Sequence, residues 1–251
     1  MSPESPGGVT PNDRPPLELR VFGPVELSGS DGAEAILVQP KRVALLTYLV
    51  LARPRGFHRR DRLVSLFWPE HSTDSARAAL RKALYAIRQA IGESALVSRG
   101  DEEIGVNRSA VWCDALEFDA AVARNDLAAA YELYRAELLE SFFADAPGFE
   151  RWLESERQRY REAAAAAAWT LAERHESSHE LTLAARWARR VAALAPSDER
   201  ALRRVLMLLD RAGDRAGALR VYEEFAARLR ADYQVEPSAE TMALVRRLRA
   251  S

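Results

Sequence analysis

Ser72–Gly92 reads STDSARAALRKALYAIRQAIG, and this stretch decides how the first half of the chain folds. Ser72 and Asp74 are residue types that accept hydrogen bonds from the free N–H groups of a helix N-terminus, and Gly92 suits a left-handed cap. At 100° per residue, one stripe of the helix is apolar and comprises Leu80, Leu84, Ile87 and Ile91, with Ala76 and Ala83 at its edge. The sequence therefore predicts one amphipathic helix that packs on a core.

The opposite face of this predicted helix carries four cations and one aromatic ring: Arg77, Arg81, Lys82, Tyr85 and Arg88. No carboxylate follows Asp74 within the helix. A helix that is apolar on one side and basic on the other can dock on a core and offer charge to a polyanion such as DNA. A solvated helix face is the alternative, since arginine is common throughout the chain.

The basic residues gather around this helix, although the chain of 251 residues has a net charge of only −1. Gln39–Gly92 contains eleven Lys/Arg and three Asp/Glu, whereas Cys113–Ser251 contains 21 and 24. The length fits one or two domains, and 48% apolar residues can bury sizeable cores. The uneven charge favours an anionic partner for the first half.

Several classes of protein are disfavoured by what the sequence lacks. Cys113 is the only cysteine, so neither an internal disulfide nor a cysteine-based metal site can form within one chain. We see no signal peptide and no apolar run of the ~18 residues that a membrane span needs. We therefore expect a cytoplasmic protein that does not act in a membrane.

The region before this helix predicts a leader, a small antiparallel sheet and two further helices. Pro, Gly and Ser dominate residues 1–16, which predicts a disordered leader. Strands are expected at Leu17–Phe22, Val25–Leu27 and Ile36–Val38, and helices at Lys41–Leu51 and Arg59–Phe67.

After the opening helix, Leu96–Val97 and Ile104–Val106 predict a two-stranded hairpin. A sheet, three helices and a hairpin follow one another in winged helix-turn-helix domains, in which the third helix enters the major groove and the hairpin reaches the neighbouring backbone or minor groove. A winged helix used for protein contact is the alternative.

From Asp114 onward the strand signals vanish and helix pairs with short turns follow, which suggests tetratricopeptide-like repeats. An offset of 34 residues places Ala184 on Ala218 and Val191 on Phe225. The helices are expected at Ala115–Arg124, Leu127–Glu140, Gly148–Arg174, Glu180–Leu194, Asp198–Arg211, Arg215–Ala231 and Ser238–Arg249.

One motif for metal chemistry occurs, because His175–His179 matches the H-E-x-x-H pattern of zinc hydrolases. That chemistry needs both histidines on one unbroken helix and a third ligand, whereas Ser177-Ser178 falls where the repeats need a turn. The sequence also lacks a P-loop, a G-x-G-x-x-G motif and a G-x-S-x-G nucleophile elbow. We therefore expect no enzyme, no metal site and no cofactor.

A specific combination of stretches runs through the chain from about Leu17 to Arg249. These stretches are LRVFGPVEL (19–27), PKRVALLTYLVLARP (40–54), RRDRLVSLFWPE (59–70), ARAALRKALYAIRQAIG (76–92), Trp112–Asp114, FERWLESERQRYRE (149–162), APSDERALRRVLMLLDRAGDRAGALRVYEEF (195–225) and VEPSAET (235–241). In this order they resemble the SARP-type regulators, in which an OmpR-like winged helix precedes a bacterial transcriptional activator domain (BTAD). The motifs are specific in combination rather than singly.

This resemblance implies a transcriptional activator that binds promoter-proximal direct repeats of double-stranded DNA, often as a homodimer, and contacts RNA polymerase. Arg81 and Lys82 would reach base edges. The family more often has uncharged polar residues at these positions, so two cations there imply stronger but less selective binding. The other residues implied to contact DNA are Arg77, Tyr85, Arg88, Arg99 on the hairpin and Arg108 after it. The polymerase-facing loop would be Trp68, Pro69, Glu70, His71 and Ser72.

The sequence thus predicts an α+β winged helix-turn-helix domain at residues 17–113, followed by an all-α tetratricopeptide-like helical repeat domain at 114–251. The predicted function is sequence-specific DNA binding in transcription regulation. The alternative is a tetratricopeptide-like scaffold whose winged helix binds protein. Because larger members of the resembling family carry further domains, the chain is expected to be either a short member or the front of a longer regulator.

Overall fold

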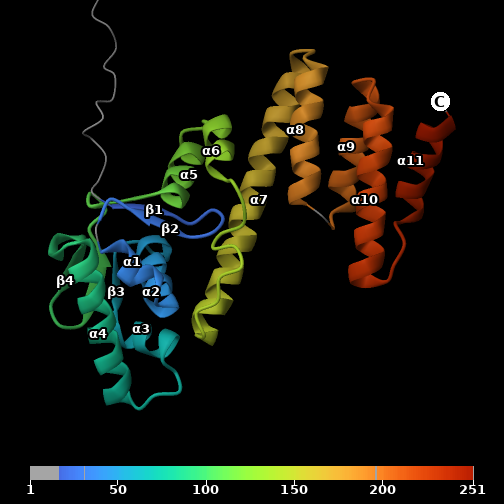
Figure 1. Cartoon of the computed structure of the whole chain (residues 1–251). Coiled ribbons are helices and arrows are strands. Elements are labelled where there is room, and N and C mark those ends of the chain that lie inside the picture. Colours follow the sequence, from blue (N-terminus) through green and yellow to red (C-terminus); the bar gives the residue numbers. More distant parts are fainter. Residues whose placement is uncertain (1–16, 31, 196, 251) are drawn as a thin grey trace, which may run out of the picture. The chain divides into compact units, whose positions relative to one another are not determined.

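The computed structural model describes residues 17–30, 32–195 and 197–250 (Figure 1). The chain divides into two compact units. Each unit is built from two segments of the chain. The first unit contains the residues up to Glu117 together with Ala136–Ser155, and the second contains Phe118–Arg135 together with the residues from Glu156 onward. The predicted leader, residues 1–16, lies outside the described residues. In the described part of the chain, no helix is both long and apolar enough to cross a membrane.

One sheet of the first unit has the strand order β2-β1-β6. β1 (Leu17–Arg20) is antiparallel to β2 (Glu26–Ser28) and parallel to β6 (Val111–Cys113). Leu17 and Leu19 are buried, whereas Glu18 and Arg20 are not, so the alternation that predicts this strand is confirmed. Cys113 is buried at the end of β6, and burial together with the Asp114 carboxylate raises the pKa of its thiol.

The strand predicted at Ile36–Val38 is wrong, because Ala33–Leu37 forms the short helix α1. Ala33 and Ile36, three residues apart, are buried on one face of α1, which packs against α2 and α4, while Val38 is 69% exposed. Gly32 permits the close approach, since a Cβ there would lie 2.6 Å from the Cα of Ala90 on α4. Tertiary packing thus overrides the strand propensity of this apolar run.

Three longer helices and a second sheet complete most of the first unit. The helices are α2 (Pro40–Leu51), α3 (Arg60–Phe67) and α4 (Thr73–Ile91), within about a residue of their predicted bounds. The hairpin strands β4 (Leu96–Arg99) and β5 (Glu103–Val106) also form, and β3 (Phe57–Arg59), which the sequence did not predict as a strand, pairs with β5.

The caps and faces of α4 agree with the pattern of its sequence. The Ser72 hydroxyl accepts a hydrogen bond from the Ser75 N–H at 3.4 Å, and Gly92 has φ +97° and ψ 147°, a positive φ but not the predicted left-handed cap. The predicted apolar stripe, from Ala76 to Ile91, is buried throughout. α4 packs against α1, α2 and α3.

Residues 136–155 belong to the first unit, although the helical segment directly before them, Phe118–Arg135, belongs to the second. The Leu139 N–H donates to the Val21 carbonyl at 2.7 Å, and the Gly23 N–H donates to the Glu137 carbonyl at 3.0 Å. The helix predicted at Leu127–Glu140 therefore ends early, as α6 (Leu127–Leu133).

Helices make up the second unit (Figure 1). α5 (Asp114–Ala123) and α7 (Pro147–Ser177) each begin within the bounds of the first unit and continue into the second. The remaining helices are α8 (Leu181–Leu194), α9 (Glu199–Arg211), α10 (Arg215–Tyr233) and α11 (Ala239–Ala250). Asp198 and Asp214 accept backbone N–H bonds as the N-caps of α9 and α10, which is why the turns before these helices are acidic.

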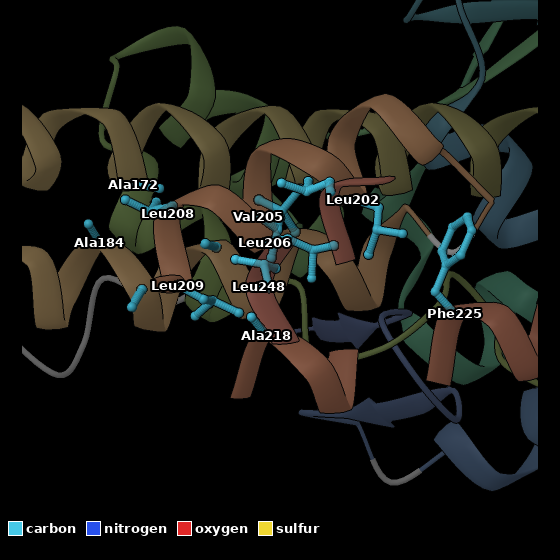
Figure 2. Close-up of a cluster of buried hydrophobic side chains, with 14 of the residues drawn as sticks. Ala172, Ala184, Leu202, Val205, Leu206, Leu208, Leu209, Ala218, Phe225 and Leu248 are labelled. Atoms are coloured by element: carbon cyan, nitrogen blue, oxygen red, sulfur yellow. The ribbon is translucent and has the colours of Figure 1, made fainter. Parts of the chain in front are cut away.

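The core of the second unit is built from α7 to α11, and Figure 2 shows its aliphatic centre around Leu206, Leu209 and Leu248. Ala184 on α8 and Ala218 on α10 are both fully buried, and Val191 and Phe225 are both 4% exposed. The pairs that the 34-residue offset predicts thus have matching burial. Small residues recur where the helices approach closely.

Candidate nucleic-acid interface

The exposed face of α4 presents Arg77, Arg81, Lys82 and Tyr85, and Tyr85 is 63% exposed. Ser72 and Gly92 fix the ends of the helix, and the buried stripe holds the opposite side against the core. This face therefore projects cations from a fixed helix and not from a loop.

The cations of α4 differ in how far they are neutralised. Arg77 donates to the Asp61 carboxylate of α3 at 3.1 Å, and Arg88, whose side chain is only 24% exposed, lies 3.8 Å from Glu93. Among the described residues, Arg81 and Lys82 are in no ion pair. These two side chains carry the unneutralised charge of the helix.

A groove of about 630 Å³ lies between α3, α4 and the hairpin turn. Leu80 and Leu84 contribute apolar surface to it. Its charged lining comprises Arg60, Asp61, Arg77, Arg81, Arg88, Asp101 and Glu102. The groove is mixed in charge because the hairpin turn is acidic, a feature that the charge pattern of α4 alone does not reveal.

The structure does not leave Arg99 free on the hairpin. Its guanidinium lies 4.7 Å from the centre of the Phe57 ring and forms an ion pair with Glu103. Arg59 of the neighbouring strand β3 lies 3.8 Å from Glu102 in the turn of the hairpin. The hairpin and β3 therefore present partly neutralised arginines beside the exposed carboxylate of Glu102.

Arg108 is exposed beyond β5 but does not line the groove. It borders a separate small hollow with Arg55 and Leu49. The structure thus brings together Arg77, Arg81 and Arg88 but not Arg108.

The predicted polymerase-facing loop joins α3 to α4. Trp68 is only 7% exposed and its ring lies 5.8 Å from that of Phe67, so this residue contributes little to the surface of the loop. Pro69, Glu70, His71 and Ser72 are exposed.

The H-E-x-x-H motif does not form the helical pair that a zinc site needs. α7 ends at Ser177, and His179 beyond it has φ +61°. The His175 Nδ1 atom instead lies 2.6 Å from the Glu180 carboxylate. No cluster of His, Cys, Asp and Glu within the described residues could hold a metal ion.

The sequence did not single out two residues that lie beside the cations of α4: Arg60 at the start of α3, which lines the groove, and Ser98 on β4, which accepts a hydrogen bond from Arg88. Arg60 lies in the basic stretch around the helix, which is a signal, but its proximity to Arg88 depends on the tertiary fold. Nothing in the sequence around Ser98 points to this position.

Comparison with known proteins identifies the class. Residues 106–249 match the model of the bacterial transcriptional activator domain, BTAD. This match covers more than half of the chain, so the chain belongs to the BTAD family, and its resemblance to SARP-type transcriptional regulators is confirmed.

One solved structure with a similar fold is that of Mycobacterium tuberculosis EmbR in complex with a low affinity phosphopeptide. The identity is 19% and the TM-score is 0.62, and the match covers 94% of this chain and 66% of that chain. At this identity the likeness concerns the fold alone. No curated protein matches the chain in sequence.

Proposed function

We propose that this chain is a sequence-specific DNA-binding transcriptional activator of the cytoplasm. Residues 17–113 act as an OmpR-like winged helix and 114–251 as the activator domain. The observation that carries the proposal is the face of α4, where Arg81 and Lys82 are exposed and in no ion pair among the described residues. Long cations on such a helix can pair with guanine O6 and N7 in the major groove.

The proposed roles of the other residues follow from placing α4 in the major groove of DNA. Tyr85 and Arg77 flank the base-reading pair, and Pro69–Ser72 face RNA polymerase. Promoter-proximal direct repeats would seat two copies of the chain. Family membership supports the regulatory role, and the exposed face of α4 supports DNA as the ligand.

The test is fluorescence anisotropy with labelled promoter-proximal DNA across a salt series, comparing wild type with Arg81→Glu. The matched control is Arg186→Glu, which makes the same charge change at an exposed position of α8. Binding through phosphates predicts that log K falls with log salt by about 0.9 per phosphate neutralised. Wild type and the control should bind alike, and Arg81→Glu should lose binding.

Equal and weak binding by all three proteins would contradict the proposal. The groove between α3, α4 and the hairpin would then be a surface for protein, as in the scaffold alternative. Its carboxylates Asp101 and Glu102 would suit such a partner.

A further inference from the structure

Three segments of the first unit converge on one hydroxyl group. The Ser98 Oγ atom on β4 accepts hydrogen bonds from Arg60 Nη2 at 3.2 Å and from Arg88 Nη2 at 3.1 Å. Arg60 begins α3 and Arg88 lies in the last turn of α4. Two guanidinium groups therefore share a single neutral partner.

This arrangement leaves hydrogen-bonding capacity unused. The Arg60 Nε atom is buried and has no hydrogen-bond partner among the described residues. A serine hydroxyl that accepts two bonds still has its own hydrogen to donate. The Ser98 residue is exposed, so an anion placed beside it could accept the hydroxyl hydrogen and gain affinity.

The two arginines also repel each other. Burial and the charge of Arg88 lower the pKa of the Arg60 guanidinium, and Asp101 offsets this only in part. Arg88 has one nearby carboxylate, that of Glu93, at 3.8 Å. The carboxylate of Asp61, which lies on α3 and lines the groove, is paired with Arg77 instead. An anion placed between Arg60 and Arg88 would relieve this repulsion.

The position of the three residues is fixed before any ligand binds. The Arg60 N–H donates to the Glu102 carbonyl at 2.8 Å, which ties the start of α3 to the hairpin turn. β5 pairs with both β3 and β4. The Arg88 side chain is 24% exposed and is held by Ser98, so it is less available to a groove of DNA than the exposed side chain of Arg81.

We propose that Arg60, Arg88 and Ser98 form a preorganised site for one backbone phosphate of bound DNA. This inference rests on the proposed function and adds two residues, Arg60 and Ser98, to the interface. It also gives Arg88 a positioning role and not a base-reading role, since phosphate contacts set the register of a protein on the duplex.

The first experiment measures the full-length protein on duplex DNA, with Arg60→Gln and Ser98→Ala as variants and Arg186→Gln as the control. Arg60→Gln should weaken binding about tenfold on every sequence and reduce the salt slope by about 1. Methylphosphonate, a neutral phosphate substitute, is then introduced at single positions of the duplex. At one position this substitution should weaken the binding of the wild type but not the binding of Arg60→Gln.

The second experiment needs no DNA. The thermal midpoint of each protein is compared in sodium phosphate and in sodium chloride at equal ionic strength. Phosphate should raise the midpoint of the wild type and the control more than that of Arg60→Gln.

The outcomes separate the two proposals. The phosphate site is overturned if two results occur together: the losses of affinity from methylphosphonate and from Arg60→Gln add at every position of the duplex, and Arg60→Gln leaves the salt slope unchanged. This holds even if Arg81→Glu abolishes DNA binding. A phosphate effect on the midpoint that is lost in Arg60→Gln, in a protein that binds no DNA, supports an anion site but overturns its assignment to a DNA backbone.

Discussion

The carboxylate of Asp114 accepts a hydrogen bond from the Val21 N–H at 3.0 Å, across 93 residues of sequence. It also accepts from the N–H groups of Phe22 at 3.1 Å and Ala115 at 2.8 Å, and Asp114 itself is 1% exposed. One side chain thus satisfies backbone donors at the end of β1 and at the start of α5.

Asp114→Ala should therefore destabilise the first unit. Buried N–H groups without a partner cost about 1–3 kcal/mol each, so we expect a loss of about 3 kcal/mol or more in the free energy of unfolding. Urea denaturation measures it. Asp126→Ala, which removes an exposed N-cap bond to Ala129, should cost about 1 kcal/mol. A loss at Asp114 no larger than at Asp126 would contradict the assigned role.

The stability of the first unit should also fall in mild acid because of His58. Its ring is buried, packs 5.4 Å from the Tyr48 ring, and leaves Nε2 without a hydrogen-bond partner among the described residues. Burial, and then the charge of Arg62, lower the pKa of His58 in the folded state. The unfolded chain therefore takes up this proton first as the pH falls below about 6.5.

The pH effect is checked by denaturation at pH 7.5 and pH 5.5. The stabilising effect of a neutral His58 is complete above the unfolded pKa and is lost as the pH falls towards the lower folded pKa. His58→Phe should reduce the difference between the two pH values. His71→Asn, at an exposed position, should leave it unchanged.

The acidic hairpin turn should restrain DNA binding. Asp101 and Glu102 line the same groove as Arg81 and Arg88, where they repel phosphate. Asp101→Asn with Glu102→Gln should tighten binding by roughly two- to fivefold at low salt, the scale expected of exposed charges. Anisotropy titrations measure this, with Glu224→Gln on α10 as the control. Weaker binding by the double variant would show that the turn contacts DNA favourably.

The paired alanines of the helical repeat should respond alike to enlargement. Ala184→Leu and Ala218→Leu each force a larger side chain into a fully buried position, at a cost of about 1–3 kcal/mol. Ala166→Leu, at an exposed position of α7, should be nearly neutral. Thermal denaturation tests both points, and a large loss at one alanine with none at the other would argue against equivalent positions.

The parts of this structure that depend on local pattern could be predicted from the sequence. The apolar stripe, the Ser72 cap and the glycine after the last turn place α4 almost to the residue, because a helix satisfies its hydrogen bonds internally. β3 could not be found in the same way, since Phe57–Arg59 becomes a strand only by pairing with β5, more than forty residues later. Leu138 and Leu139 likewise leave the predicted helix because they complete the first unit beside Val21 and Phe22.

In the candidate site, too, the features set by local pattern could be predicted and those set by tertiary contacts could not. Arg81 and Lys82 are exposed where the helical period places them, whereas the partners of Arg77, Arg88 and Arg99 come from neighbouring elements. Charge counted along one helix therefore overstates what the folded surface offers. The meeting of Arg60, Arg88 and Ser98 depends on three elements at once and has no local signature.

The burial of Cys113 gives the protein a built-in reporter of its own unfolding. A thiol that is 1% exposed and whose pKa is raised by burial stays protonated and unreactive towards maleimides while the first unit is folded. Since the sequence has no other cysteine, every alkylated molecule records an opening of that unit. The rate of labelling then follows local unfolding around β6 without any engineered probe. A second cysteine placed on the exposed helices could carry a dye with little background.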